Sequence, residues 1–219
     1  MNNKIKILIV DDHPIVRQGI IYLLEKEKDI QVCGEAEDAL EALAAIPRLK
    51  PNLIIIDISL PIGNGLELIK NISTLYPQII MLVLSMHDES LYAERVVRAG
   101  AKGYIMKSEA TDKLITAIRR VADGEIFLSK DIKERIFTKV LQSSTKPYSS
   151  SIDLLSDREL QIFQMVGEGI KTRTIANNLN LSISTVNTHY THIKKKLGLT
   201  SNNELIQYAV NWFLSEGKK

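Results

Sequence analysis

Short apolar runs alternate along the first 124 residues with segments whose apolar residues recur at every third or fourth position. Such runs predict buried strands, and the helical spacing between them predicts amphipathic helices. The run Leu53-Ile54-Ile55-Ile56 is apolar throughout and ends in Asp57, which is typical of a central strand covered on both faces. We expect the other strands at 5–10, 30–34, 79–84 and 103–106, with helices at 14–24, 38–49, 66–76, 89–99 and 112–123.

Details of this pattern place particular residues. Pro14 suits the first position of a helix. Asp38 is expected to cap the second helix, with Leu40, Leu43 and Ile46 on its inner face, and Asp112 is expected to open the last helix. Five consecutive strand–helix units require right-handed crossovers, so they predict an α/β doubly wound parallel five-stranded sheet with helices on both faces.

The pattern changes after Gly124. A helix is expected near 131–141, followed by a Ser-rich, Pro-containing run at 142–151 that is typical of a linker. From Ile152 onward only helical spacing is found. We therefore predict a first domain at 1–124, a linker at 125–152 and a small all-α domain at 153–219.

Composition is that of an ordinary globular protein, with 45% hydrophobic and 25% charged residues. The single Cys33 cannot form an internal disulfide, and no apolar run is long enough to span a bilayer. We expect a soluble cytoplasmic protein with no membrane partner and no signal peptide. Residues 1–130 hold 16 Lys and Arg against 18 acidic residues, whereas the remainder holds 12 against 8. This asymmetry favours a polyanionic partner for the C-terminal part.

Polar side chains stand where the predicted strands end. Because parallel strands share one direction, Asp11, Asp12, Asp57, Ser85 and Lys107 are expected to converge at one edge of the sheet. Clustered carboxylates are stable around a cation, and their oxygens suit Mg²⁺. With a lysine and a hydroxyl beside them, they suit a carboxylate that accepts a phosphoryl group. The alternative is that Asp57 only caps the turn before the next helix.

Residues 4–123 resemble the receiver domain of two-component response regulators. The resemblance is carried by Asp11-Asp12, by Asp57 to Pro61, by Leu84-Ser85 and by Ala99 to Lys107. It implies a flavodoxin-like fold with strand order 2-1-3-4-5, and phosphorylation of Asp57 by a sensor histidine kinase. It also implies that Asp12, Asp57 and the backbone carbonyl of Ser59 bind Mg²⁺, with Asp11 acting mainly through water. Ser85 and Lys107 would contact the phosphoryl group, and Tyr104 would be the switch aromatic.

Alternatives remain for these positions. The plain structural interpretations are that Lys107 is a solvated surface lysine and that Ser85 and Tyr104 are turn and core residues. His87 is interpreted as a loop residue rather than a metal ligand or a phosphorelay histidine. Gly63 departs from the receiver pattern, in which many members carry a bulky apolar residue.

The C-terminal segment contains three candidate helix starts. Ser156 and Glu159 form a capping box, Thr172 is expected to cap a short helix, and Ser182 is expected to cap a helix from Ile183 to Leu197. At 100° per residue this third helix separates into two faces. The apolar face holds Val186, Tyr190, Ile193 and Leu197, and the polar face holds Ser184, Thr188, Thr191 and Lys195. An outward strip of hydroxyls and lysine fits the major groove of double-stranded DNA.

Residues 153–215 resemble the LuxR-type helix-turn-helix, through Leu155 to Glu159, Gly169, Ile175-Ala176, Thr185-Val186 and Lys196 to Gly198. With the receiver, the whole chain resembles a NarL/FixJ-type response regulator. The resemblance implies base or phosphate contacts from Asn187, Thr188 and Thr191, with Lys195 on the DNA backbone. Asn187 and Thr191 stand where many relatives carry Lys, and Thr174 replaces a usual acidic residue. For His189 there are two interpretations, a phosphate contact and a residue that only fills space beside the core. The final helix, 202–214, would pair two domains; its candidate residues are Leu205, Ala209 and Trp212.

The resulting hypothesis is a transcription factor, not an enzyme, whose phosphorylation at Asp57 controls DNA binding as a homodimer. One alternative is a constitutive DNA-binding protein with an unphosphorylated receiver. Another is an Asp-nucleophile phosphatase, which is disfavoured because such enzymes need an acid two residues on, where Ser59 stands.

Overall fold

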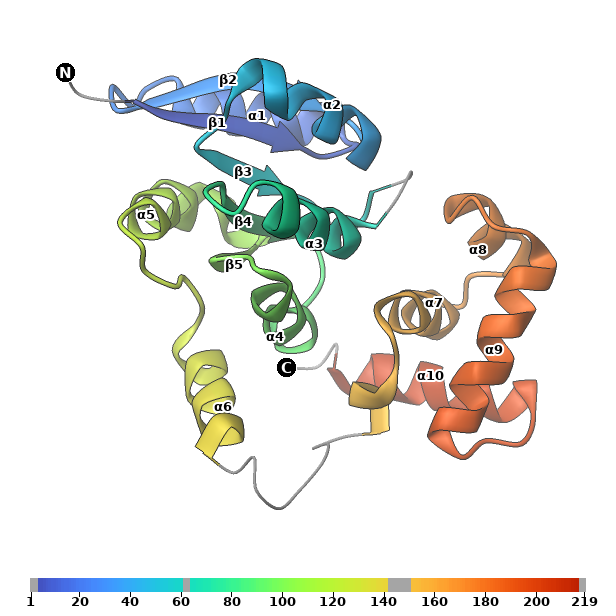
Figure 1. Cartoon of the computed structure of the whole chain (residues 1–219). Helices are drawn as coiled ribbons and strands as arrows, with labels where there is room; N and C mark the ends of the chain where they lie inside the picture. Colours follow the sequence, from blue (N-terminus) through green and yellow to red (C-terminus); the bar gives the residue numbers. More distant parts are fainter. Residues whose placement is uncertain (1–3, 61–63, 142–150, 217–219) are drawn as a thin grey trace. The chain divides into compact units, whose positions relative to one another are not determined.

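Figure 1 shows a computed structural model of the chain, which describes residues 4–60, 64–141 and 151–216. The chain divides into two compact units, residues 1–141 and residues 142–219. The division falls within the segment predicted as a linker, and the helix predicted there belongs to the first unit. Gly63 and residues 142–150 of the Ser-rich run lie outside the described residues.

The first unit is built on one parallel sheet in the order β2-β1-β3-β4-β5, which confirms the predicted doubly wound architecture. Central β3 is apolar throughout because its neighbours β1 and β4 pair with both of its edges and helices cover both of its faces. The strands are β1 (Ile5–Val10), β2 (Ile30–Ala36), β3 (Leu53–Ile56), β4 (Ile80–Ser85) and β5 (Gly103–Met106).

Helices cover the two faces of this sheet. Helices α1 (Pro14–Leu24) and α5 (Ala110–Ala122) share one apolar core with side chains from one face of the strands. Along the opposite face, α2 (Ala39–Leu49) packs beside α3 (Gly65–Leu75), and α3 packs beside α4 (Glu89–Ala99). A short 3-10 turn, Lys107–Glu109, precedes α5, and α6 (Lys130–Leu141) packs beside α4.

Two expected details of the first unit are wrong. Leu40 does not face inward but is 66% exposed. The predicted cap itself is confirmed, since the Asp38 side chain accepts from Glu41 N at 2.8 Å, but the inner face of the helix falls on smaller residues. The last helix begins at Ala110 rather than Asp112, because the turn at Lys107 leads directly into it. The inner face of α2 consists of Ala39, Ala42, Ala45 and Ile46.

The second unit is helical throughout its described residues. After the short turn Ser151–Leu154 it contains α7 (Asp157–Gly167), α8 (Thr172–Asn178), α9 (Ile183–Leu197) and α10 (Asn202–Glu216). The predicted capping box at Ser156 and the Ser182 cap are confirmed. Thr172 is the first residue of α8 and not its cap, since Lys171 occupies the cap position without a side-chain hydrogen bond. None of the described helices is long and apolar enough to cross a bilayer.

Candidate functional site

The carboxyl ends of four neighbouring strands meet at one edge of the sheet. Val10 pairs with Ile56, Ile56 with Val83, and Ser85 with Met106, so the residues that follow these positions lie at a common level. The structure thereby brings Asp11, Asp57 and Lys107 into direct contact, although 96 positions separate the first from the last. Ser85 ends β4 beside them and is fully buried.

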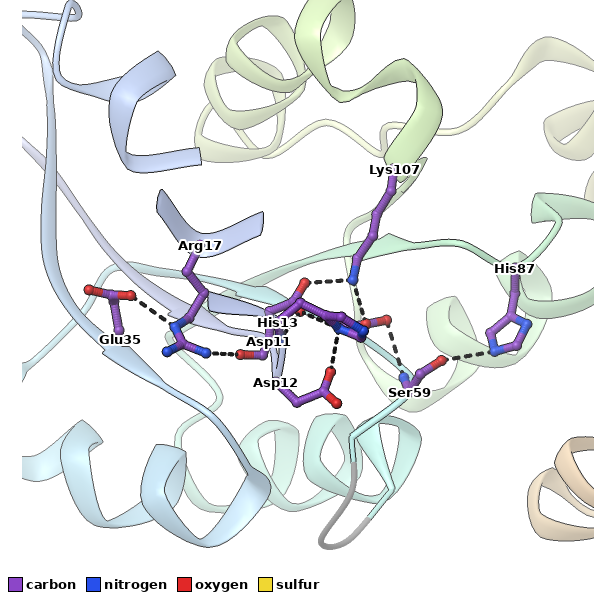
Figure 2. Close-up of polar contacts among 9 residues, drawn as sticks. Asp11, Asp12, His13, Arg17, Glu35, Ser59, His87 and Lys107 are labelled. Atoms are coloured by element: carbon purple, nitrogen blue, oxygen red, sulfur yellow. Dashed lines mark hydrogen bonds and ion pairs between the residues drawn. The ribbon is translucent and has the colours of Figure 1, made fainter. Parts of the chain in front are cut away.

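Lys107 joins two buried carboxylates (Figure 2). Its Nζ lies 2.6 Å from Asp11 Oδ2 and 2.6 Å from Asp57 Oδ2, and all three side chains are at most 8% exposed. Burial lowers the pKa of Lys107, but the charges and hydrogen bonds of Asp57 and Asp11 outweigh it, so the net shift is upward. One ammonium group therefore forms ion pairs with two carboxylates, and the cluster keeps an excess of negative charge.

Asp12 adds a third carboxylate, and one of its oxygens lacks a hydrogen-bond donor among the described residues. Its Oδ1 is buried and accepts no hydrogen bond from the described residues, although His13 Nδ1 lies 2.7 Å away. His13 Nδ1 is also 3.2 Å from Asp11 Oδ1, and the His13 backbone N–H donates to that oxygen at 2.9 Å. Ligand atoms of Asp11, Asp12, His13 and Asp57 all lie within 4.8 Å of one another. Surplus carboxylates gathered this closely fit a divalent cation such as Mg²⁺.

Ser59 and His87 connect the pocket to the loop after β4. The Ser59 backbone N–H donates to Asp57 Oδ1 at 3.1 Å, which places the Ser59 backbone beside the acceptor carboxylate. The Ser59 hydroxyl lies 2.9 Å from His87 Nε2, as Figure 2 shows. The His87 ring packs on Tyr92 at 4.9 Å, and burial is the main cause of its lowered pKa. His87 lies in the loop between β4 and α4, as interpreted from the sequence, and its ring also links Ser59 to Tyr92.

Tyr104 and Ser85 both bond to the backbone of His87. The Tyr104 hydroxyl donates to the His87 carbonyl at 2.8 Å, and the His87 N–H donates to Ser85 Oγ at 3.3 Å. Tyr104 is 2% exposed, and this burial raises the pKa of its hydroxyl well above 10. The two predicted switch side chains therefore bond to the two peptide groups that flank His87 in the loop between β4 and α4.

Arg17 supports the acidic turn from α1, and sequence reasoning missed it. Its Nη1 donates to the Asp11 carbonyl at 2.6 Å, and its Nε donates to Glu35 Oε2 at 2.9 Å, as seen in Figure 2. Glu35 lies on β2, so the guanidinium ties together β2, α1 and the turn that carries Asp11 and Asp12. Periodicity could not identify this residue, because an arginine on a helix is usually a solvated one.

In the second unit, α9 separates into the two faces expected of it. Val186, Tyr190 and Ile193 are buried, whereas Leu197, at the end of the same face, is half-buried. The Thr188 and Thr191 hydroxyls donate to the carbonyls of Ser184 and Asn187, each at 3.1 Å, so they stay on the helix surface. The predicted DNA-contacting residues are all exposed, and they are Ser184, Asn187, Thr188, Thr191 and Lys195.

An ion pair between the buried Glu159 and the exposed Lys196 holds α9 on α7. Glu159 Oε2 accepts from Lys196 Nζ and from the Ser156 N–H, each at 2.6 Å. Nearby, His189 Nδ1 is buried without a partner among the described residues, and burial is the main cause of its lowered pKa. The position of α9 therefore depends on a polar contact between its last turn and the first turn of α7.

Helix α10 packs on α7, and two of the residues predicted for dimerisation are buried within this unit. Leu205 and Ala209 are buried inside the unit, and a Cβ added at Gly167 would lie 2.7 Å from the Ala209 carbonyl. Trp212 is half-buried, with its ring 5.4 Å from that of Phe163. The exposed apolar side chains of this helix are Ile206, Tyr208, Phe213 and Leu214.

Comparisons with known proteins agree with both halves of this description. Residues 7–119 match the response regulator receiver domain, and residues 153–209 match the luxR family of bacterial regulatory proteins. The chain is 38% identical to the oxygen regulatory protein NreC of Staphylococcus epidermidis, covering 96% of this chain and 99% of that one. It is 36% identical to NreC of Staphylococcus aureus, with the same shares covered.

Solved structures of response regulators are similar to this chain along nearly its whole length. The RcsB response regulator of Salmonella typhimurium is 28% identical, with a TM-score of 0.70 over 95% of this chain and 98% of that one. An RcsB–DNA complex is 28% identical, with a TM-score of 0.66 over 94% and 99%. The chain therefore belongs to the NarL/FixJ family of two-component response regulators, which join a receiver domain to a LuxR-type DNA-binding domain.

Proposed function

We propose that Asp57 accepts a phosphoryl group from a sensor histidine kinase and that this modification controls DNA binding by the C-terminal domain. The observation that carries the proposal is the buried Asp57 carboxylate, held between Lys107 and the Ser59 N–H beside two further carboxylates. In the transfer, an Asp57 oxygen forms a bond to phosphorus as the bond from phosphorus to the kinase imidazole nitrogen breaks. The product is an acyl phosphate that carries about −1.5 to −2 charges in place of the single negative charge of the free carboxylate.

The neighbouring residues have separate parts in this step. Asp11, Asp12, Asp57 and the Ser59 carbonyl would hold Mg²⁺, which supplies neutralisation of phosphoryl charge when bound. Lys107 already lies at Asp57 Oδ2, so its ammonium is in place to bind a phosphoryl oxygen there. The buried Ser85 hydroxyl can donate to another phosphoryl oxygen, which would draw it from the His87 N–H.

The route from the pocket toward the rest of the chain starts at His87. Its backbone bonds both Ser85 and Tyr104, and α4 begins two residues later, at Glu89. The Glu89 carboxylate accepts from the Ser129 N–H at 2.8 Å, and the Arg135 guanidinium donates to the Ser90 carbonyl. These contacts fasten α6 to the first turn of α4, so a shift of the β4–α4 loop changes the surface on which α6 rests.

The strand β5 makes a second connection to the same segment. The Tyr104 N–H donates to the Phe127 carbonyl at 2.9 Å, and the Phe127 N–H donates to the Lys102 carbonyl at 2.8 Å. Leu128 and Ile132 are buried beyond it. The segment that leads to the DNA-binding domain is therefore bonded to the residue that carries the switch side chain, and we propose that it transmits the change.

In the DNA-binding domain, α9 would lie in the major groove, with Asn187, Thr188 and Thr191 reaching base edges or phosphates and Lys195 the DNA backbone. Support comes from the exposed position of these side chains and from the likeness to RcsB, which was solved bound to DNA. A homodimer that pairs two domains through α10 would read two half-sites. Trp212 is half-exposed there, whereas Leu205 and Ala209 would act by fixing the helix from within.

The test is labelling of the full chain with acetyl phosphate and Mg²⁺, followed by phosphate-affinity electrophoresis. Asp57→Asn should abolish labelling, whereas Asp112→Asn, an exposed carboxylate on α5, should label as the wild type does. Labelling of Asp57→Asn at the wild-type level would exclude Asp57 as the acceptor.

A second measurement tests the control of DNA binding. Genome-wide binding, measured with and without phosphorylation, should show that occupancy of the operators depends on the acyl phosphate. Equal affinity for an operator in both states would favour the constitutive DNA-binding alternative.

A further inference from the structure

One large apolar side chain of α9 stays at the surface of the second unit. Ile183, the first residue of the helix, is 48% exposed, whereas Val186, Tyr190 and Ile193 are at most 7% exposed. In the described part of this unit, the other exposed large apolar side chains lie on α10 or, for Leu154, in the turn before α7. Ile183 is therefore an apolar group that neither the core of the unit nor the proposed pairing through α10 explains.

Ile183 borders the face of α9 that is proposed to contact DNA. Residues four apart are neighbours on a helix surface, so Ile183 lies beside Asn187, about 40° away around the axis. Ser184 follows it directly, and both of these polar side chains are exposed. In a helix-turn-helix such as α8 and α9 (Figure 1), the N-terminal residues of the second helix contact base edges in the major groove. Ile183 thus extends the proposed contact face to the N-terminal end of α9.

The first turn of α9 fixes the position of Ile183. The Ser182 hydroxyl accepts from the Thr185 N–H at 3.0 Å and lies 2.7 Å from Thr185 Oγ1, so these two polar side chains are bonded to each other. A β-branched side chain such as isoleucine has one strongly preferred χ1 rotamer in a helix. Little side-chain entropy is therefore lost when a ligand covers Ile183, and no acidic residue in this turn repels a phosphate.

The chemistry of an aliphatic side chain selects one group of the major groove. The C5-methyl group of thymine is the apolar feature of this groove, whereas the other bases present hydrogen-bond donors and acceptors. Isoleucine forms no hydrogen bond, so covering the cytosine amine would leave a donor without a partner. We propose that Ile183 contacts the C5-methyl group of a thymine and thereby sets a preference for thymine at one position of each half-site. The inference rests on the proposed DNA binding by α9 and deepens it.

The test begins with a selection of DNA by the full chain. The protein is treated with acetyl phosphate and Mg²⁺ and incubated with a library of random-sequence duplexes, and the bound fraction is sequenced. In a duplex selected by the wild type, each thymine is then replaced singly by deoxyuridine, which lacks only the methyl group of the base. One such replacement in each half-site should weaken binding by the wild type about fourfold in fluorescence anisotropy, as expected for one buried methyl group.

Variants assign that thymine to Ile183. Ile183→Ala should bind the thymine and deoxyuridine duplexes with equal affinity and should lose the preference for thymine in the selection. Ile183→Val keeps the branched methyl groups and should keep the sensitivity to deoxyuridine. Leu40→Ala, which removes an exposed aliphatic side chain of α2, is the matched control and should behave as the wild type does. The fluorescence of Trp212 in urea shows whether each variant is folded.

Each outcome supports or overturns the contact. Absence of a deoxyuridine effect at every position in the wild type would overturn the inference without any variant, as would an effect of the same size in Ile183→Ala. An effect that depends on Ile183 and is the same with and without acetyl phosphate would support the inference and refute the proposed control by phosphorylation. Failure of the chain to bind any duplex in either state would refute DNA binding and the inference with it.

Discussion

Each unit of the chain pairs a buried carboxylate with a lysine, and the two clusters differ in how completely their charges are matched. In the second unit, one carboxylate oxygen of Glu159 accepts from Lys196 and from the Ser156 N–H, so the pair is complete. In the first unit, Lys107 is shared by Asp11 and Asp57, and Asp12 Oδ1 has no hydrogen-bond partner among the described residues. The matched pair fixes a helix, whereas the unmatched cluster favours a cation and a phosphoryl group.

The largest effect is expected when the ammonium is removed from the unmatched cluster. Lys107→Met leaves two buried carboxylates side by side and should lower the free energy of unfolding of the first unit by about 3 kcal/mol at neutral pH. Urea unfolding followed by far-UV circular dichroism measures this loss. Lys102→Met, at an exposed lysine before β5, should change it by less than about 0.5 kcal/mol.

The pH dependence of this loss follows from the raised pKa of Lys107. The stabilisation is present below the unfolded pKa of about 10.5 and is lost as the pH rises through the higher folded pKa. The difference between the wild type and Lys107→Met should therefore shrink only above about pH 10.5. An equal loss for both lysine variants would contradict the importance of the cluster.

Breaking the matched pair should have a smaller effect, confined to the second unit. Glu159→Gln removes a charge-assisted hydrogen bond and should lower the free energy of unfolding of this unit by about 2 kcal/mol. The fluorescence of Trp212, the single tryptophan, reports this transition because its ring packs on Phe163. Glu168→Gln, at an exposed glutamate, is the control and should leave the transition nearly unchanged.

Acid should remove the stabilisation that the Glu159–Lys196 pair gives to the second unit. Burial raises the pKa of Glu159, but hydrogen bonds from Lys196 and Ser156 outweigh it and hold the pKa below 4.5. The contribution is therefore present above about pH 4.5 and is lost as the pH falls through the lower folded pKa. A difference between the wild type and Glu159→Gln that grows on acidification would contradict this assignment.

Addition and removal of Mg²⁺ distinguish the two clusters directly. At ten times its dissociation constant, Mg²⁺ should stabilise the first unit by about 1.4 kcal/mol, and chelation should reverse this. The Trp212 transition of the second unit should not move. Asp12→Asn should abolish the response, because it removes one of the proposed ligands. Equal shifts of both transitions in thermal unfolding would show a general ionic effect instead of a site.

The smallest effects on stability are expected on the outward face of α9. Asn187→Ala and Thr188→Ala change exposed side chains, so each should alter the free energy of unfolding by less than about 0.5 kcal/mol. Each should nevertheless weaken operator binding by about 1 kcal/mol, or about fivefold, in fluorescence anisotropy. Lys195→Ala should reduce the slope of affinity against salt by about one, as expected for one phosphate contact. Unchanged affinity in all three variants would exclude this face of α9.

The hydrophobic pattern alone was enough to predict the succession of strands and helices along the first unit. The apolar run at Leu53 to Ile56 requires cover on both faces, and the parallel direction of the strands follows from the helices between them. The convergence of Asp11, Asp57 and Lys107 then follows from geometry, because ends of parallel strands meet at one edge. The cap at Ser182 and the capping box at Ser156 were equally visible, since local hydrogen bonds depend on neighbours in sequence.

Only the tertiary structure determined which side chains meet across long separations in the sequence. The bonds of Arg17 to Asp11 and Glu35, of His87 to Ser59, and of Arg135 to Ser90 join residues on different elements, and no periodicity encodes such pairs. The exposure of Leu40 shows the same limit, because the predicted cap at Asp38 is present and yet packing selects Ala39, Ala42, Ala45 and Ile46 as the inner face. Local pattern specifies the elements, whereas packing specifies the polar contacts between them.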